Sequence, residues 1–539
     1  MSSDKKLIAK TGLIGVINQA VFAILGFISR KLFIIYIGTD ILGLSGTYTS
    51  VLSTLALADL GFDIAVTYAL YKPLNDGDEK RINAIMRALK TIYNVVGTAF
   101  IVLSFCALPF LKFFITDMEF KDIYYVYFLM QALASASTYF FAYRRTLLVA
   151  DKKEYLTKTV DTIGTLVFSV LKILVLIWFK SYLLFVACSV VQAFVTNIYI
   201  YVKCSKVYPY LNSKSKTDKN VIKDLLAKIK DIALGKISGY VYGCTDMLLI
   251  SKLISTVVAG YYYNYLTVIT IIKQLSANLV GPLAPFIGRS LAEDKDPVSQ
   301  EKSFRMYTYI RYLVAVVLLV PTMVLVDLFV EIWLGAEFVM QSIIVILVCA
   351  DLYISLVHSS LVDYMNGSGL FRYEKWISLA GAIVNLGTSI FLALNIGLPG
   401  VLAGTVIAQI VYWTCRSIVV YDQCFKSKKL FAQYWLRMLI YLAIFVGCYF
   451  ACMKVTSLFV YDWKIVTFII RGIVCEIMCG IIVKTTTTTT VPSVIRKAVG
   501  YTSSTYATKV WIQKRKTLIN YHYSMKDYES TTIFKTDEG

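Results

Sequence analysis

Long apolar bands dominate the pattern of hydrophobic and polar positions along this chain. The hydrophobic fraction of its 539 residues is 58%. The apolar runs reach the ~20 residues that a helix needs to cross a hydrocarbon core of about 30 Å. They lack the strict alternation of a membrane β-barrel strand. The pattern therefore predicts an all-α integral membrane protein, because only helices and closed barrels satisfy their backbone hydrogen bonds inside lipid.

Fourteen such bands can be delimited, and each is predicted to form one transmembrane helix. The predicted spans are 11–37, 41–71, 83–111, 122–149, 157–179, 181–204, 229–253, 256–287, 306–332, 338–366, 374–395, 397–424, 433–457 and 464–484.

The basic residues sort onto one side of these spans. Only six of the 54 Lys and Arg residues fall on the side with the shortest links, namely Lys112, Lys121, Lys180, Lys252, Lys454 and Lys464. The positive-inside rule makes the opposite side cytoplasmic. Both termini are then expected in the cytoplasm, which an even number of spans allows.

The longest internal polar stretch divides six spans from eight. We therefore expect an N-terminal six-helix lobe over 1–205, a cytoplasmic linker over 206–228, a second six-helix lobe over 229–425, two additional helices over 426–484 and a cytoplasmic tail over 485–539. Parallel repeats of six helices are a known transporter plan. A weak internal echo fits it, since Gly46-Thr47-Tyr48 enters the second span and Gly260-Tyr261-Tyr262 enters the eighth.

Composition excludes several classes of function. The formal net charge of +20 is explained by cytoplasmic loops that face anionic lipid, and no soluble domain remains to bind nucleic acid. The eleven cysteines form no CxxC pair and there are only two histidines, so neither a metal centre nor another cofactor is expected. Gly235-Lys236 lacks the preceding glycines of a phosphate-binding loop. An enzyme is not expected.

Charged residues inside the spans are the candidate functional groups, because a charge in lipid is costly and usually faces a cavity or a partner. The basic residues from both halves could converge on an anion, with nearby tyrosine and amide side chains for sugars. The candidate substrate-binding residues are Arg30, Lys31, Lys236, Lys273, Tyr262 and Asn264. The candidate ion-coupling residues are Asp59, Asp63, Asp246, Asp351 and His358.

Two of these assignments keep an alternative. Arg30 and Lys31 could instead extend toward the membrane interface. Asp351 and His358 lie seven residues apart on one helix face, where a structural hydrogen-bonded pair and a proton relay are equally good interpretations.

Several motifs resemble those of a known transporter family, and they run in family order. The second span has a Gly-Leu-x-Gly opening, a Leu-Ala-Asp-Leu-Gly centre and a Tyr-x-Leu-Tyr-Lys-Pro-Leu exit. These and the further matches are Gly43–Gly46, Leu57–Gly61, Tyr68–Leu74, Tyr143–Tyr155, Tyr208–Leu211, Thr245–Ser251, Ala259–Tyr265 and Ile332–Gly335. Together they resemble the Wzx-like flippases of capsule, exopolysaccharide and O-antigen repeat units, in the multidrug/oligosaccharidyl-lipid/polysaccharide exporter superfamily.

The resemblance implies two six-helix lobes around a central cavity, with extra helices at the C-terminus. It also implies flipping of undecaprenyl-pyrophosphate-linked oligosaccharides across the bacterial plasma membrane by alternating access, without covalent change. The lipid-linked substrate and the bilayer are then the expected partners, and a polysaccharide polymerase with its chain-length machinery is a candidate partner. The alternatives are a cation-coupled multidrug exporter of the same superfamily, a membrane glycan polymerase or ligase, and a non-transporting scaffold for glycan assembly.

Overall fold

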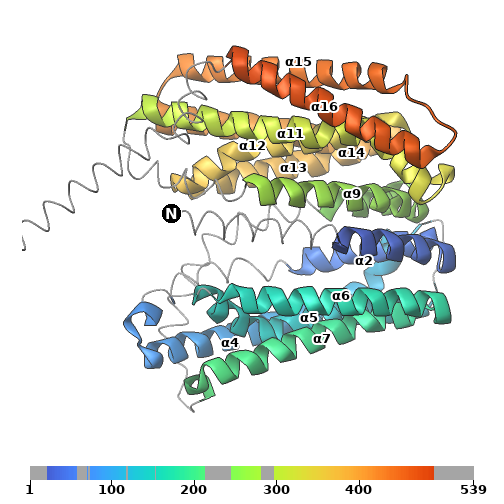
Figure 1. Cartoon of the computed structure of the whole chain (residues 1–539). Coiled ribbons are helices and arrows are strands. Elements are labelled where there is room, and N and C mark those ends of the chain that lie inside the picture. Colours follow the sequence, from blue (N-terminus) through green and yellow to red (C-terminus); the bar gives the residue numbers. More distant parts are fainter. Residues whose placement is uncertain are drawn as a thin grey trace, which may run out of the picture.

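The protein is described here by a computed structural model that covers residues 21–56, 70, 73–116, 119, 121–151, 153–212, 244–280 and 296–490. Within these ranges every regular element is a helix (Figure 1). Residues 21–36 and 244–253 are helical, and the longer elements are α2 (Thr39–Leu55), α4 (Glu79–Phe114), α5 (Ile123–Ala150), α6 (Glu154–Phe179), α7 (Tyr182–Val207), α9 (Thr256–Val280), α11 (Pro297–Trp333), α12 (Ser342–Gly367), α13 (Phe371–Ile396), α14 (Leu398–Val420), α15 (Lys428–Thr456) and α16 (Lys464–Thr490).

Polar caps set where several helices begin. The Asp78 carboxylate accepts a hydrogen bond from the Arg81 amide at the start of α4. Asp296 accepts from the amides of Val298 and Ser299 at the start of α11, whose first residue is a proline. These caps satisfy amides that a helix leaves without intrahelical acceptors. As a result α4 and α11 are 36 and 37 residues long, several residues longer than the apolar bands predict.

The N-terminal lobe is built on α4–α7, with α2 at its inner side. Helix α5 packs against α4 and α7, and α6 packs against α7. A core of aromatic and aliphatic side chains fills this lobe, and Tyr48 is representative. Its ring meets Phe128 edge to face with centroids 5.3 Å apart, and its hydroxyl donates to the Tyr124 carbonyl oxygen. These contacts tie α2 to α5.

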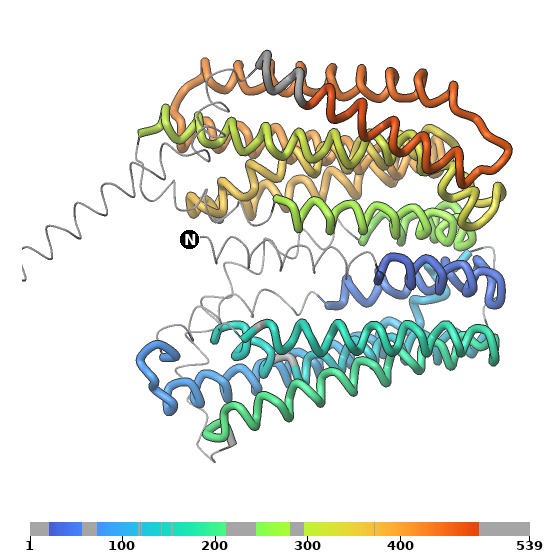
Figure 2. The backbone as a smooth tube through the Cα atoms, in the orientation of Figure 1, coloured from blue at the N-terminus to red at the C-terminus, as the bar shows by residue number. Residues whose placement is uncertain are grey.

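The C-terminal lobe contains α9 and α11–α16. Helices α12, α13 and α14 pack against one another, and α11 packs against α12. The last two helices, α15 and α16, pack against each other and against α11, at the edge of the lobe (Figure 1). In Figure 2 the N-terminal lobe is blue to green and the C-terminal lobe is green to red, and each forms its own group of helices. Helices α2 and α9 lie next to each other where the two lobes meet. The exact lobe boundaries at residues 205 and 425 stay predictions.

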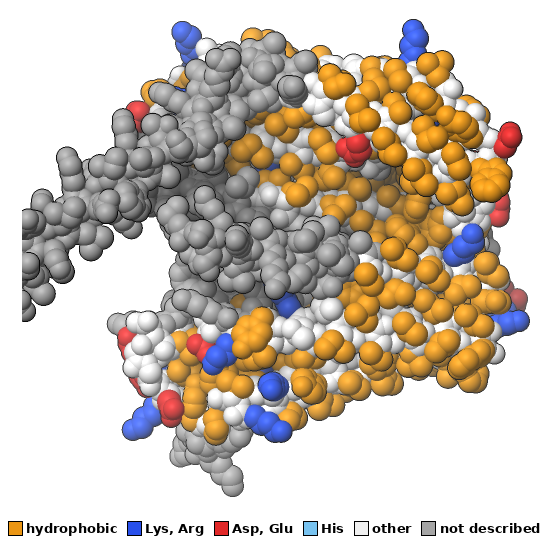
Figure 3. All heavy atoms as spheres, in the orientation of Figure 1, with side chains coloured by type: hydrophobic (Ala, Val, Ile, Leu, Met, Phe, Trp, Pro, Cys, Tyr) orange, Lys and Arg blue, Asp and Glu red, His pale blue; other side chains and the backbone are white. Residues whose placement is uncertain are grey.

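The outer surface has the character of a membrane protein. Nine helices in the described part of the chain are long and apolar enough to cross a bilayer. Figure 3 shows hydrophobic side chains spread over the middle of both lobes, with charged side chains near the two ends. The predicted all-helical membrane fold is confirmed. The count of fourteen spans and the cytoplasmic placement of both termini stay predictions.

The two ends of the helix bundle differ in their connections. At one end, on the right in Figure 1, the links are as short as Gly38 and Lys180–Ser181. We call this the short-link end, and the opposite end, where α4 begins and α7 finishes, the loop end.

Candidate functional site

The two lobes meet at the short-link end through two glycines. A Cβ atom built on Gly43 of α2 would lie 1.9 Å from the backbone oxygen of Thr256 in α9. One built on Gly260 of α9 would lie 2.4 Å from the backbone oxygen of Thr39. No side chain fits in either place, so these residues allow the two helix backbones to touch, as small residues do in membrane helix pairs.

Hydrogen bonds reinforce this contact. The Thr116 hydroxyl donates to the Ser251 carbonyl oxygen at 2.6 Å, and the Thr116 amide donates to the Thr256 hydroxyl at 2.9 Å. The Ser251 hydroxyl in turn donates to the Phe114 carbonyl oxygen at 2.7 Å. All three bonds join the end of α4 to the turn between 244–253 and α9. The lobes are therefore closed against each other at the short-link end.

A pocket of about 130 Å³ with both apolar and charged lining residues lies between the lobes, on the side of this closure that faces the loop end. Helix α2 contributes a glycine and two hydroxyl residues, and the second lobe contributes charged and aromatic residues from several helices. The lining residues are Gly46, Thr49, Ser50, Asp246, Met247, Tyr262, Tyr263, Leu266, Ile269, Lys273, Leu347, Val348, Asp351, Leu402 and Thr405.

Two carboxylates and one amine give the pocket its charge. Asp246 accepts a hydrogen bond of 2.7 Å from the Thr405 hydroxyl, which itself accepts one of 3.0 Å from the Asn385 amide. This chain of bonds fixes Asp246 against α13 and α14. Asp351 comes from α12 and Lys273 from α9, and Lys273 is exposed. An exposed amine in the same pocket as two carboxylates is available to an anion that enters.

Arg30 lies at the margin of the pocket. Its guanidinium stacks over the ring of Tyr263 at 4.4 Å and donates to the Thr267 hydroxyl at 3.0 Å. The buried Nη1 atom of the same group has no hydrogen-bond partner among the described residues. Stacking on an aromatic face holds the cation without neutralising it. Arg30 thus brings a positive charge from the first lobe to the edge of a pocket whose charged lining residues come from the second.

A protein-family model described as Polysaccharide biosynthesis protein matches residues 8–291, slightly more than half of the chain. The chain belongs to this family. No curated protein sequence matches it.

Several solved transporter structures share the fold of this chain. An inward-closed structure of the lipid II flippase MurJ superposes with a TM-score of 0.62 at 14% identity, covering 88% of this chain and 99% of MurJ. An inward-facing multidrug resistance MATE family transporter of the MOP superfamily gives 0.56 at 12% identity, covering 74% and 95%. The MATE multidrug transporter DinF-BH gives 0.55 at 15% identity, covering 78% and 97%. The fold is therefore that of the predicted exporter superfamily.

The structure brings four of the predicted residues into one pocket: Lys273, Tyr262, Asp246 and Asp351. Arg30 joins them through Tyr263, which also lines the pocket. Lys31 is exposed and Asn264 is fully buried, and neither is among the lining residues. Both amide atoms of Asn264 are without a hydrogen-bond partner in the described part of the chain.

The remaining predicted residues lie elsewhere. Asp59, Asp63 and Lys236 fall outside the described residues. His358 is buried beside α14, with its Nε2 atom 2.5 Å from the Arg416 guanidinium, which also forms an ion pair with Glu374. Asp351 lines the pocket, whereas His358 contacts the Arg416–Glu374 ion pair. The two residues therefore have different surroundings, although they share one face of α12.

Sequence reasoning missed the neutral part of the pocket. Thr405 and Asn385 position Asp246, and Ser50 and Gly46 supply the wall from α2. Hydroxyl groups and glycines are common in membrane helices, so nothing in their residue type distinguishes them. Gly43 and Gly260 are each the fifth residue of their helix, and this shared position, rather than the match of Gly46 with Gly260, is the signal that could have identified the α2–α9 contact.

Proposed function

We propose that this protein flips undecaprenyl-pyrophosphate-linked oligosaccharide repeat units across the bacterial plasma membrane for polysaccharide export, by alternating access and without covalent change. The observation that carries the proposal is the charged pocket between the two lobes, beside the α2–α9 contact that holds them together at the short-link end. With the positive-inside orientation, that closed end faces outward and the pocket faces the cytoplasm. In this orientation the lipid-linked substrate enters the pocket from the cytoplasmic side.

The size of the pocket favours a charged headgroup over a whole glycan. A volume of about 130 Å³ is below the roughly 300–1,000 Å³ of ordinary small-molecule sites. A diphosphate can use it, and the sugars then lie toward the loop end. There α9 presents an exposed polar face that includes Thr270, Lys273, Gln274 and Asn278. These residues are spaced as neighbours on one helix face, which suits repeated hydrogen bonds to sugar hydroxyls.

Lys273 and Arg30 are the proposed anion contacts. Charge-assisted bonds from an amine and a guanidinium to phosphate oxygens are among the stronger hydrogen bonds in proteins. The two groups come from opposite lobes, since Lys273 is on α9 and Arg30 is on the helix over 21–36. An anion held by both links the lobes from the pocket side, so its binding can alter the balance between closed and open states of the α2–α9 contact.

Asp246 and Asp351 are the proposed coupling residues. Both line the same pocket as Lys273, so a bound cation or proton can neutralise them while the amine binds a diphosphate. Intramembrane carboxylates are used in such relays in many transporters. Arrival of substrate and uptake of the coupling ion are then linked through a single amine.

The proposal is tested by flipping of a fluorescent undecaprenyl-pyrophosphate oligosaccharide in proteoliposomes. We expect Lys273→Ala and Arg30→Ala to lower the initial rate at least about tenfold, which corresponds to one lost charge-assisted bond. Lys172→Ala is the matched control, because this intramembrane lysine lies within the first lobe and contacts Gln192. Equal rates in all variants would remove the assigned site, and an inactive wild type beside an active reference flippase would remove the function.

A cation-coupled multidrug exporter is the second candidate. The two carboxylates of the pocket favour it, because Asp246 and Asp351 outnumber the single amine Lys273 among the lining residues. The same proteoliposomes, loaded with a fluorescent organic cation under a proton or sodium gradient, distinguish the two functions. Cation export that is lost in Asp246→Asn, together with no lipid flipping, would favour the exporter.

A further inference from the structure

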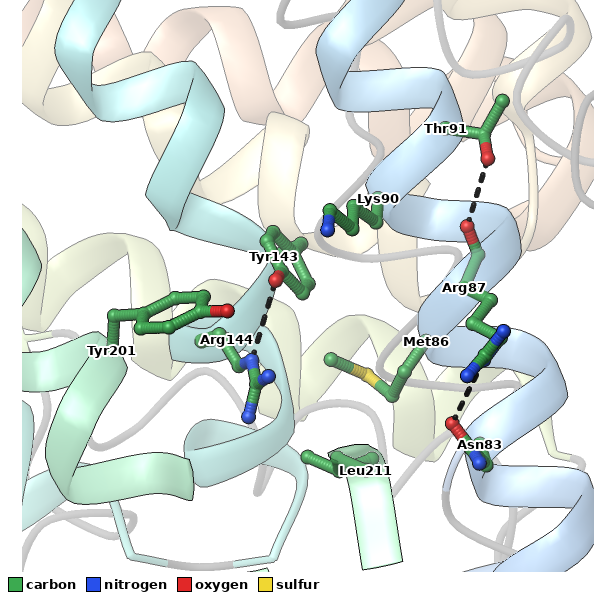
Figure 4. A pocket seen from close by; sticks show the side chains of 9 residues that line it. All are labelled: Asn83, Met86, Arg87, Lys90, Thr91, Tyr143, Arg144, Tyr201 and Leu211. Atoms are coloured by element: carbon green, nitrogen blue, oxygen red, sulfur yellow. Dashed lines mark hydrogen bonds between the residues drawn. The ribbon is translucent and has the colours of Figure 1, made fainter. Parts of the chain in front are cut away.

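A second pocket lies within the N-terminal lobe, at its loop end. Its volume is about 340 Å³, and it lies between α4, α5 and α7 beside the short helix η2 (Pro209–Asn212). Figure 4 shows its side chains extending from α4 on one side and from α5 and α7 on the other. The lining residues are Asn83, Met86, Arg87, Lys90, Thr91, Tyr143, Arg144, Tyr201 and Leu211.

Three cations line this pocket, and its nine described lining residues include no carboxylate. Arg87 and Lys90 are three residues apart on α4, so they share one helix face. Arg144 comes from α5 on the other side (Figure 4). Arg144 and Lys90 carry like charges on opposite walls of the pocket, and an anion bound between them is attracted by both. The residues of the central pocket are entirely different.

Arg144 is held in place but not neutralised. Only 4% of its surface is exposed, and its guanidinium stacks over Tyr201 at 4.5 Å and Tyr143 at 5.5 Å. Its Nε atom donates to the Tyr143 hydroxyl at 3.3 Å. Its Nη1 atom is buried and has no hydrogen-bond partner among the described residues. A buried donor of a charged group left without an acceptor is costly, so its presence beside a cavity points to an absent ligand.

The depth of the pocket matches a membrane interface. Arg144 follows the short-link start of α5 by 21 residues and Tyr201 follows that of α7 by 19, which places them about 30 Å along their helices at 1.5 Å per residue. That distance equals the thickness of the hydrocarbon core, at whose far side the lipid phosphates begin. In the predicted orientation this side is the cytoplasmic leaflet.

We propose that this pocket is a second anion site, which binds the phosphate or diphosphate oxygens of a lipid headgroup at the cytoplasmic interface. Arg144 supplies planar, directional donors to the phosphate oxygens, and Lys90 and Arg87 add positive charge from the opposite wall. The site does not depend on the proposed flipping, because the three cations bind such a headgroup whether or not it is later transported.

The test measures lipid binding to the full chain in detergent by microscale thermophoresis. A Lys273→Ala background removes the anion contact proposed for the central pocket. The probes are undecaprenyl pyrophosphate, phosphatidylglycerol and inorganic pyrophosphate. We expect Lys90→Gln and Arg144→Gln each to weaken binding of a phosphate-bearing lipid about tenfold or more. The matched control is Lys203→Gln, which removes an exposed charge from α7 only two residues from Tyr201.

The three probes separate the sources of the phosphate. If the Lys90→Gln and Arg144→Gln variants bind undecaprenyl pyrophosphate about tenfold more weakly, the site is assigned to the polyprenyl headgroup. If they instead bind phosphatidylglycerol about tenfold more weakly, it is assigned to a resident phospholipid. Binding of inorganic pyrophosphate as tight as that of either lipid, together with no loss in the variants, would overturn the proposal. So would unchanged lipid binding in Lys90→Gln and Arg87→Gln, two variants that leave the buried arginine in place and so test the pocket even if Arg144→Gln fails to fold.

Discussion

Closure of the short-link end can be broken by a single methyl group. In Gly43→Ala the added Cβ would begin 1.9 Å from the Thr256 oxygen, while ordinary contact starts at 3.4 Å. The two helices must therefore separate locally by roughly 1.5 Å. The obstacle is backbone, which cannot rotate away as a flexible side chain does. Overpacking of this kind typically costs about 1–3 kcal/mol.

The same substitution also has a favourable term. Alanine is a better helix former than glycine by about 1 kcal/mol. This gain is the same whether the lobes are closed or separated, so only the steric cost at Gly43, where the contact is backbone to backbone, shifts the balance between the two states. No steric cost is expected at Gly447 in α15, where an added Cβ meets nothing within 4 Å. Gly447→Ala is the matched control, and we expect it to be neutral or slightly stabilising.

The readout is the distance between the lobes at the short-link end. Spin labels at the exposed positions Lys121 and Glu337, one in each lobe, report that distance by double electron–electron resonance. We expect Gly43→Ala to shift the distribution toward longer distances by a factor of roughly 5–150 in population, the equivalent of 1–3 kcal/mol. An unchanged distribution, with a melting temperature equal to that of the wild type, would refute the reasoning.

Three further predictions concern other contacts. Oxidation with copper phenanthroline should link Cys448 to Cys479, whose sulfur atoms are 3.9 Å apart; digestion and mass spectrometry would find the linked α15–α16 peptides, and their absence in oxidised protein would contradict the packing. Glu374→Gln should destabilise the protein by about 3–5 kcal/mol, since it leaves the Arg416 charge buried and unpaired, and thermal unfolding would measure it; a melting temperature equal to that of the wild type would argue against the ion pair. Thr405→Val should lower transport while leaving the melting temperature within a few degrees, because it removes one hydrogen bond to a pocket carboxylate; normal transport would show that this bond does not matter.

The sequence predicts most of the helices because lipid imposes a simple rule on them. An apolar run of sufficient length has to become a helix, and α6, α7 and α13 follow their bands within a few residues. The rule fails at the ends of α4 and α11. There the polar caps Asp78 and Asp296 extend the helices beyond the apolar bands. Capping is a local hydrogen-bond effect that hydrophobicity does not register.

The site is partly predictable for a similar reason. Lys273, Asp246 and Asp351 are noticeable because a charge inside a membrane span is costly and requires an explanation. The pairing of charges is a different matter. Arg416 lies 58 residues after His358 in the sequence, and only the packing of α12 against α14 places it beside that histidine. The distance between two residues along the sequence does not indicate a contact between helices such as this one.

The glycine contact between α2 and α9 also determines how the protein can be controlled. Backbone atoms carry no titratable charge, so closure at Gly43 and Gly260 is insensitive to external pH and salt. In the proposed orientation this contact faces outward. Control over opening is then left to the ionisable groups of the central pocket, and changes in the medium outside the cell reach them only after the α2–α9 contact has separated.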